Sequence, residues 1–77
     1  MPKAYVLISA DRGAEEILVH KLRSTQNVKE AYCVYGAYDV VTTIDAPTME
    51  ELKQMIALKV QALPEVKSTL SRLSRLD

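Results

Sequence analysis

The stretch "VKEAYCVYGAYDVVTTID", residues 28–45, holds one of only two glycines in this chain of 77 residues. β-Branched, aromatic and other apolar residues lead up to Gly36 and away from it, which is typical of strands. So few residues separate the segment 28–35 from Val40–Asp45 that the two predicted strands must form a tight hairpin. Gly36 supplies the positive φ that a turn requires, and the Asp39 side chain can bond the backbone of that turn.

The residues before the hairpin predict one strand and one helix. "KAYVLISA", residues 3–10, is rich in β-branched and aromatic side chains and predicts a strand. Between residues 14 and 24 apolar side chains recur at helical spacing, which predicts a helix with one inner face. The predicted inner face consists of Ala14, Ile17, Leu18 and Leu22.

The residues after the hairpin repeat that order as a helix and a strand. Thr48 is a good N-cap, and Glu51 three residues later completes a capping box that opens the helix. Pro64 ends it. Its predicted inner face consists of Leu52, Met55, Ile56, Val60 and Leu63. "VKSTLSRLSRL", residues 66–76, then predicts a fourth strand.

The resulting order, β-α-β-β-α-β, predicts the α+β class. It indicates a ferredoxin-like sandwich, in which two helices cover one face of a four-stranded antiparallel sheet. The length leaves room for a single domain over residues 1–77 and no second one.

The predicted strands carry apolar side chains on both faces of the sheet. In the first strand Tyr5 and Leu7 point away from the face that holds Ala4, Val6, Ile8 and Ala10. The alternation assigns Val28, Tyr32 and Val34 to one face of the second strand and Ala31, Cys33 and Tyr35 to the other; in the third, Val41 opposes Val40 and Ile44. Two short helices cover only one face, so the other would expose an apolar patch. We therefore expect a homodimer that packs sheet to sheet about a two-fold axis.

Composition excludes several classes of function. Ten basic and ten acidic residues give a net charge of zero, which argues against a nucleic-acid binder. The N-terminal apolar run is too short for a signal peptide or a membrane span, and a single cysteine excludes an internal disulfide. We therefore expect a soluble, cytoplasmic protein that binds neither membranes nor nucleic acid.

The sequence also lacks the residue sets of common enzymes. His20 is the only histidine and is predicted to lie on a polar helix face, while Cys33 is interpreted as a small buried hydrophobe. Glu15 and Glu16 are adjacent and point in different directions on a helix. No metal-ligand spacing or Gly-rich phosphate loop is present. We expect a non-enzymatic protein without a cofactor.

The turn "GAYD" allows a further interpretation beside that of a plain hairpin. It would leave backbone N–H groups facing outward close to the Asp39 carboxylate. A zwitterionic amino acid needs donors for its carboxylate and an anion for its ammonium group, so this pairing suits such a ligand. Hydroxyl groups that would add donors are those of Thr42, Thr43, Thr69 and Ser71. The residues alone leave both interpretations open.

The segments "AYVLI", "AYCVYGAYDVVTTIDAPTMEEL" and "VKSTLSRL" resemble the effector-binding C-terminal domain (RAM domain) of the Lrp/AsnC, or feast/famine, transcriptional regulators. The resemblance covers essentially the whole chain and implies face-to-face dimers that assemble into octamers or other rings. It also implies amino-acid binding between dimers, near the Gly-x-aromatic-Asp turn. Gly36, Tyr38 and Asp39 match that turn. Ala37 departs from the acidic or polar residue of many relatives, and Thr69 and Ser71 are weaker candidates for the same cleft.

The family's N-terminal helix-turn-helix has no counterpart here, because the first strand begins at residue 3. The resemblance therefore implies a stand-alone effector domain that senses an amino acid. We expect ligand-dependent assembly, and mixed oligomers with a full-length Lrp/AsnC regulator that modulate transcription. A purely structural oligomer without a ligand response is the alternative. An isomerase or monooxygenase on this fold would need a catalytic base, and His20 is a poor one.

Overall fold

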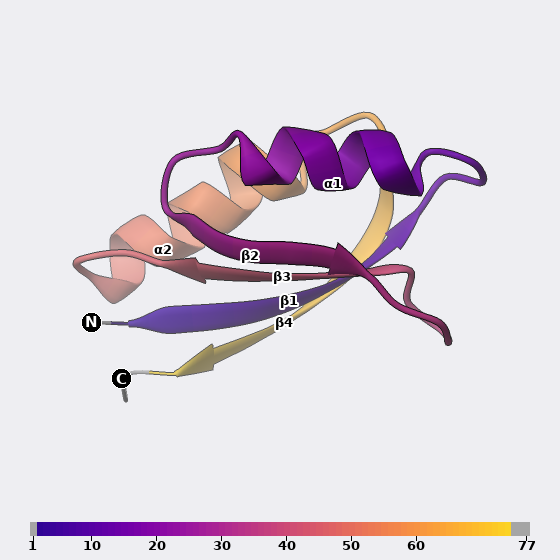
Figure 1. The fold of residues 1–77 in the computed structure, drawn as a ribbon. Coiled ribbons are helices and arrows are strands. Elements are labelled where there is room, and N and C mark those ends of the chain that lie inside the picture. The colour runs from indigo at the N-terminus through magenta and orange to yellow at the C-terminus, as the bar shows by residue number, and fades with distance from the viewer. Residues whose placement is uncertain (1, 75–77) are drawn as a thin grey trace.

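The computed structural model describes residues 2–74 and contains four strands and two helical segments (Figure 1). In chain order these are β1 (Lys3–Ala10), α1 (Glu15–Arg23), β2 (Val28–Cys33), β3 (Val40–Asp45), α2 (Met49–Met55) with its continuation η1 (Ile56–Val60), and β4 (Val66–Ser74). The predicted β-α-β-β-α-β order is confirmed. The strands at Lys3–Ala10 and Val40–Asp45 have the predicted bounds, and the predicted end of the last strand at Leu76 lies outside the described residues.

The four strands form one sheet in the order β2-β3-β1-β4, and all neighbouring pairs are antiparallel. The central strand β1 pairs along most of its length with both β3 and β4. Both helices lie on one side of this sheet, and no element covers the other side within the described residues (Figure 1). We call that uncovered side the open face.

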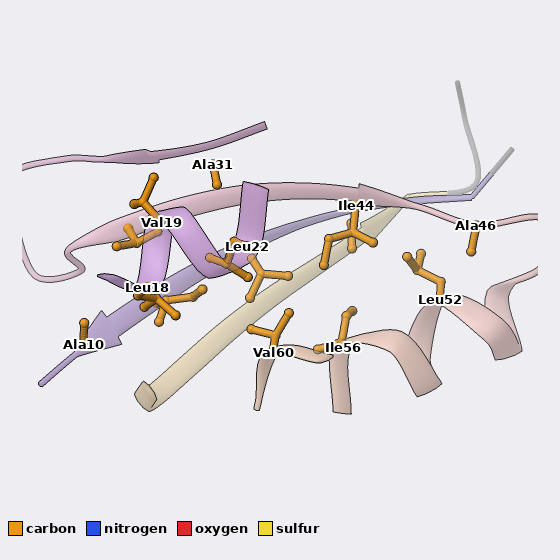
Figure 2. Close-up of a cluster of buried hydrophobic side chains, with 14 residues drawn as sticks. Ala10, Leu18, Val19, Leu22, Ala31, Ile44, Ala46, Leu52, Ile56 and Val60 are labelled. Atoms are coloured by element: carbon orange, nitrogen blue, oxygen red, sulfur yellow. The ribbon is translucent and has the colours of Figure 1, made fainter. Parts of the chain in front are cut away.

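The hydrophobic core lies between the helices and the sheet (Figure 2). Leu18 and Leu22 of α1 are fully buried, as are the even-numbered residues of β1 from Ala4 to Ile8. The second helical segment contributes Leu52, Ile56 and Val60. Burial of each large aliphatic side chain contributes about 1.5–3 kcal/mol, so these residues determine which face of each helix turns toward the sheet.

The two helices differ from the prediction at particular residues. Ile17 was assigned to the inner face of α1, but its side chain is 55% exposed, and Val19 is buried instead. Thr48 caps α2 as predicted, because its Oγ1 accepts a hydrogen bond from the Glu51 N–H at 3.1 Å. The helix then widens at Ile56–Val60 into a π-helical turn. Leu52, Ile56 and Val60 are nevertheless all buried, and Met55 is partly buried against the core. The helix ends at Val60 rather than at Pro64, so Leu63 packs against the core from the connection to β4.

Strand β2 differs from the prediction in its register and its length. Val28 pairs with Ile44 while Glu30 pairs with Thr43, so Lys29 is an extra residue in a β-bulge. The bulge breaks the alternation, and Val28 packs against the core rather than lying on the face of Tyr32 as assigned. The strand ends at Cys33, so a six-residue connection replaces the predicted tight turn.

One row of apolar side chains crosses the open face from edge to edge. Tyr32 pairs with Val41, Val41 with Leu7, and Leu7 with Leu70, so the four residues are neighbours across all four strands. Tyr5 lies beside this row, and Tyr5, Tyr32 and Leu70 are each about half exposed. The two-sided apolar pattern predicted for β1 and β3 is confirmed, and a patch of this kind marks an interaction surface.

Candidate ligand site at the connection between β2 and β3

The connection between β2 and β3, residues 34–39, projects from one end of the sheet beside the connection between β1 and α1 (Figure 1). Two backbone hydrogen bonds fix its base. The Val34 N–H donates to the Asp39 carbonyl at 2.8 Å, and the Asp39 N–H donates to the Ile8 carbonyl at 2.8 Å. The loop is therefore anchored to its own hairpin and to the central strand.

The Asp39 side chain adds a third anchor. Its Oδ2 accepts a hydrogen bond from the Ala10 N–H at 3.0 Å. The sequence predicted that this carboxylate would bond the backbone of its own turn, but its partner is the end of β1. The β1–β3 pairing ends at Ile8 and Val40, so the carboxylate supplies the acceptor that a longer β3 would have offered to Ala10.

A cavity of about 360 Å³ lies between the start of α1 and this loop. Its lining consists of Glu15, Glu16, Cys33, Val34, Tyr35 and Asp39. Three of these side chains are carboxylates, so the cavity favours a ligand group with positive charge. Tyr35 is fully exposed and Val34 is half-buried, so the same cavity also offers apolar contact.

The loop that borders the cavity has free backbone donors. Within residues 2–74, the backbone N–H groups of residues 35–38 donate no hydrogen bond. Gly36 has a φ of 142°, a conformation that residues with a side chain rarely adopt. No atom lies within 4 Å of the point where a Cβ would be attached to it. Of residues 35–38 only Tyr35 lines the cavity, so one free backbone donor borders the carboxylates and the other three lie farther along the loop.

Of the predicted site residues, only Asp39 lines the cavity. Gly36 and Ala37 are exposed at the loop tip, and Tyr38 and Asp39 are half-buried at its base. Thr69 and Ser71 lie on β4, beyond the central strand, and they do not line the cavity. The Thr69 hydroxyl accepts a hydrogen bond from the Gln61 side chain at 3.1 Å. The other hydroxyls considered, those of Thr42 and Thr43, are buried in β3.

Five of the six residues that line the cavity were not predicted as site residues: Glu15, Glu16, Cys33, Val34 and Tyr35. Glu15 and Glu16 form no carboxylate pair in the sequence pattern, yet both line the cavity, and Cys33 is exposed rather than buried as predicted. Cys33 is the last residue of β2, and the cavity separates it from the start of α1. The signal that would have found them is topological, since both connections fall at the same end of the predicted sheet.

Other kinds of site receive no support from the described residues. His20 is exposed on α1, as predicted. No group of three or more His, Cys, Asp or Glu side chains among residues 2–74 is arranged to hold a metal ion. No helix in this part of the chain is long and apolar enough to span a membrane.

Comparisons with known proteins agree with this architecture. Residues 3–74 match the family model described as the Lrp/AsnC ligand binding domain. The regulatory protein AsnC of Haemophilus influenzae is 34% identical over 69 residues, which are 90% of this chain and 45% of that protein. This chain therefore spans less than half the length of that relative.

Solved structures show the same fold. A hypothetical protein from Pyrococcus horikoshii has a TM-score of 0.94 and 34% identity, over 100% of this chain and 93% of that one. A Neisseria meningitidis transcriptional regulator, solved as a complex with L-Met, has a TM-score of 0.83 over 95% of this chain and 49% of that one. At 15% identity, the latter supports the fold alone. Given the family match across its length, this chain belongs to the Lrp/AsnC ligand-binding domain family.

Proposed function

We propose that this protein is a non-enzymatic sensing module that binds a free amino acid at the loop between β2 and β3. The observation that carries the proposal is the cavity beside that loop, which three carboxylates line together with Tyr35, the first of four loop residues whose backbone N–H groups donate no hydrogen bond within the described chain. The match to a ligand-binding family of regulators supports a binding role over a catalytic one.

The chemistry of the cavity favours an α-amino acid over a simple amine or a simple acid. The ammonium group would lie against Glu15 and Glu16, because one oxygen of Asp39 already accepts from Ala10. The ligand carboxylate would accept hydrogen bonds from the loop tip, where Ala37 offers only its backbone N–H. The complex of the N. meningitidis regulator with L-Met is consistent with this class of ligand.

Ligand binding is proposed to act through assembly. The cavity is open and the Tyr35 ring beside it is fully exposed, so a neighbouring copy is well placed to cover a bound ligand. The open face would form the primary homodimer, and contacts around the loops would join dimers into octamers or other rings. A ligand shifts such an equilibrium only as far as its affinity differs between the two assemblies.

The link to transcription is proposed to be indirect. Both helical segments of residues 2–74 are used to cover the sheet, so neither is free to serve as a recognition helix. We expect mixed assembly with a full-length Lrp/AsnC regulator, and no sequence-specific DNA binding by this chain. A gel-shift assay with the purified protein tests this directly, and clear operator binding would contradict it.

A thermal-shift screen of the twenty amino acids tests the binding proposal. A ligand at 100 times its dissociation constant stabilises a fold by about 2.7 kcal/mol, which is easily resolved in a domain of this size. We expect at least one amino acid at millimolar concentration to raise the melting temperature of the wild type. Glu16→Gln should reduce the shift, because Glu16 lines the cavity.

Glu51→Gln is the matched control for that variant. Glu51 lies in the first turn of α2, as Glu16 does in α1, and it is remote from the cavity lining. It should therefore keep the full ligand-induced shift. A screen in which no amino acid moves the melting temperature would favour the alternative function, a structural oligomer that uses only the open face.

A further inference from the structure

A second row of side chains crosses the open face beside the apolar row, and it carries opposite charges at its two ends. Glu30 pairs with Thr43, Thr43 with Tyr5, and Tyr5 with Arg72. The row therefore begins with a carboxylate on edge strand β2 and ends with a guanidinium on edge strand β4. Both charged side chains are exposed.

These two charges cannot neutralise each other within one chain. Three strand spacings separate Glu30 from Arg72, a distance of about 14 Å. Among residues 2–74, neither side chain forms an ion pair. Each is left at the rim of an apolar surface, where a partner of opposite charge would guide docking.

Two-fold symmetry restricts how a second copy can meet this face. An axis that runs along the strands places β2 of one subunit opposite β4 of the other, and keeps each row opposite the same row. Glu30 then faces Arg72 of the partner subunit, twice in the dimer. An axis across the strands places β2 opposite β2, so either like charges meet or each charge faces a residue of another row.

The next row has the same polarity. Asp45 on β3 pairs with Lys3 on β1, and Lys3 pairs with Ser74 on β4. The axis along the strands brings Asp45 opposite Lys3 of the partner subunit. Asp45 also lies 3.9 Å from Lys29 of its own chain, so this row contributes a weaker preference than the row of Glu30.

We propose that a second copy of this chain docks on the open face with the two-fold axis along the strands, and that Glu30 pairs with Arg72 of the partner subunit. This inference rests on the proposed sheet-to-sheet dimer and specifies its geometry. The apolar row then meets itself, with Tyr32 opposite Leu70 of the partner subunit. Sheets packed face to face lie about 10 Å apart, which Glu and Arg side chains together can span.

This arrangement would make the open face bind another copy of this chain in preference to a related sheet. A related sheet with a similar apolar row but a different order of charges would place like charges together or leave a charge unpaired. Such mismatches act as the repulsive element of specificity. The two charges would therefore determine which copies form dimers, while the apolar row supplies most of the affinity.

Charge reversal tests the pairing through the dimer dissociation constant, measured by analytical ultracentrifugation. E30R and R72E should each weaken self-association by about tenfold per contact, and so by about a hundredfold for the two symmetric contacts. The double variant E30R/R72E restores opposite charges and should dimerise like the wild type. An equimolar mixture of E30R and R72E should form heterodimers of near wild-type affinity.

Controls separate this inference from its premise. Glu51→Arg and Lys53→Glu make similar charge changes on α2, away from the open face, and should leave the dissociation constant unchanged. A wild type that remains monomeric at high concentration overturns the dimer and the pairing together. A dimeric wild type whose affinity is unaffected by E30R and R72E overturns the pairing alone. Circular dichroism checks that each variant is folded. Heterodimers in the mixture of E30R and R72E would also show that both variants are folded and able to associate.

Discussion

The Asp39 carboxylate accepts a hydrogen bond from the Ala10 N–H at 3.0 Å and so joins the candidate binding loop to the central strand. The backbone of Asp39 makes the neighbouring contact, because its N–H donates to the Ile8 carbonyl. Asp39 thus has a structural role that is independent of any ligand, and this determines how its substitution must be interpreted.

We expect Asp39→Ala to destabilise the fold by about 1–3 kcal/mol, because it leaves the Ala10 N–H without an acceptor in a partly buried site. Asp39→Asn retains an amide oxygen that can accept the same hydrogen bond and should cost less. Urea denaturation of the three proteins measures the difference. Equal midpoints for wild type and Asp39→Ala would show that the hydrogen bond contributes nothing to stability.

Gly36→Ala should also destabilise the protein, here through the backbone rather than through contacts. The φ of 142° is unfavourable for any residue with a Cβ, although no atom lies within 4 Å of the added Cβ. We expect a cost on the order of 1–3 kcal/mol in urea denaturation.

Gly13→Asn is the comparison for this change. Its φ of 81° falls near the left-handed region that asparagine tolerates, so it should cost less than Gly36→Ala. The opposite ranking of the two variants would argue against backbone strain as the cause.

The ion pair between α1 and the segment before β4 predicts a pH dependence of stability. The Lys21 Nζ lies 2.7 Å from the Glu65 Oε2, and this hydrogen bond from Lys21 holds the pKa of Glu65 below its ordinary value of 4.5. A carboxyl group whose pKa is lower in the folded state stabilises the fold above the unfolded pKa. That contribution is lost as the pH falls through 4.5 toward the folded pKa.

Urea denaturation of wild type and Glu65→Gln between about pH 7 and about pH 3 checks this dependence. The wild type should be the more stable protein at neutral pH, and the difference should shrink as the solution becomes acidic. A difference that stays constant over the whole range would show that the charge of Glu65 is not its source.

Leu18→Ala should cost about 2–5 kcal/mol, since Leu18 is fully buried between α1 and the sheet. Leu58→Ala is the matched control, because that side chain is 68% exposed and its removal leaves no cavity. Thermal denaturation should show a large decrease in melting temperature for the first variant and a small one for the second. Similar decreases would contradict the assignment of the core.

The fold followed from local patterns because those patterns report backbone periodicity directly. Lys3–Ala10 alternates between a buried face and the open face, and Thr48 with Glu51 begins α2 as expected. The bulge at Lys29 had no such signal. The bulge depends on the pairing of β2 with β3. Just before β2, Asn27 adopts a φ of 74°, and its side chain donates a hydrogen bond to the carbonyl of Asp45 on β3. The π-helical turn at Ile56–Val60 likewise interrupts no apolar spacing and was not predicted.

Of the residues that line the candidate cavity, only Asp39 was predicted from the sequence as a site residue. The turn residues Gly36 and Asp39 predicted the loop, whereas Glu15 and Cys33 belong to other elements. They meet the loop only because the sheet order places both connections at one end. Residue spacing along the chain contains no such information, and the same limit placed Thr69 and Ser71 nearer to the loop than they are.

The rate at which a thiol reagent modifies Cys33 tests the central claim most directly, because Cys33 is an exposed cysteine that lines the cavity itself. Cysteine is left out because its own thiol would consume the reagent; among the other nineteen amino acids, added in turn, at least one should slow the modification. Glu16→Gln should weaken that protection and Glu51→Gln should preserve it. Modification at an unchanged rate with all nineteen, at concentrations up to the millimolar range, would contradict binding at this site.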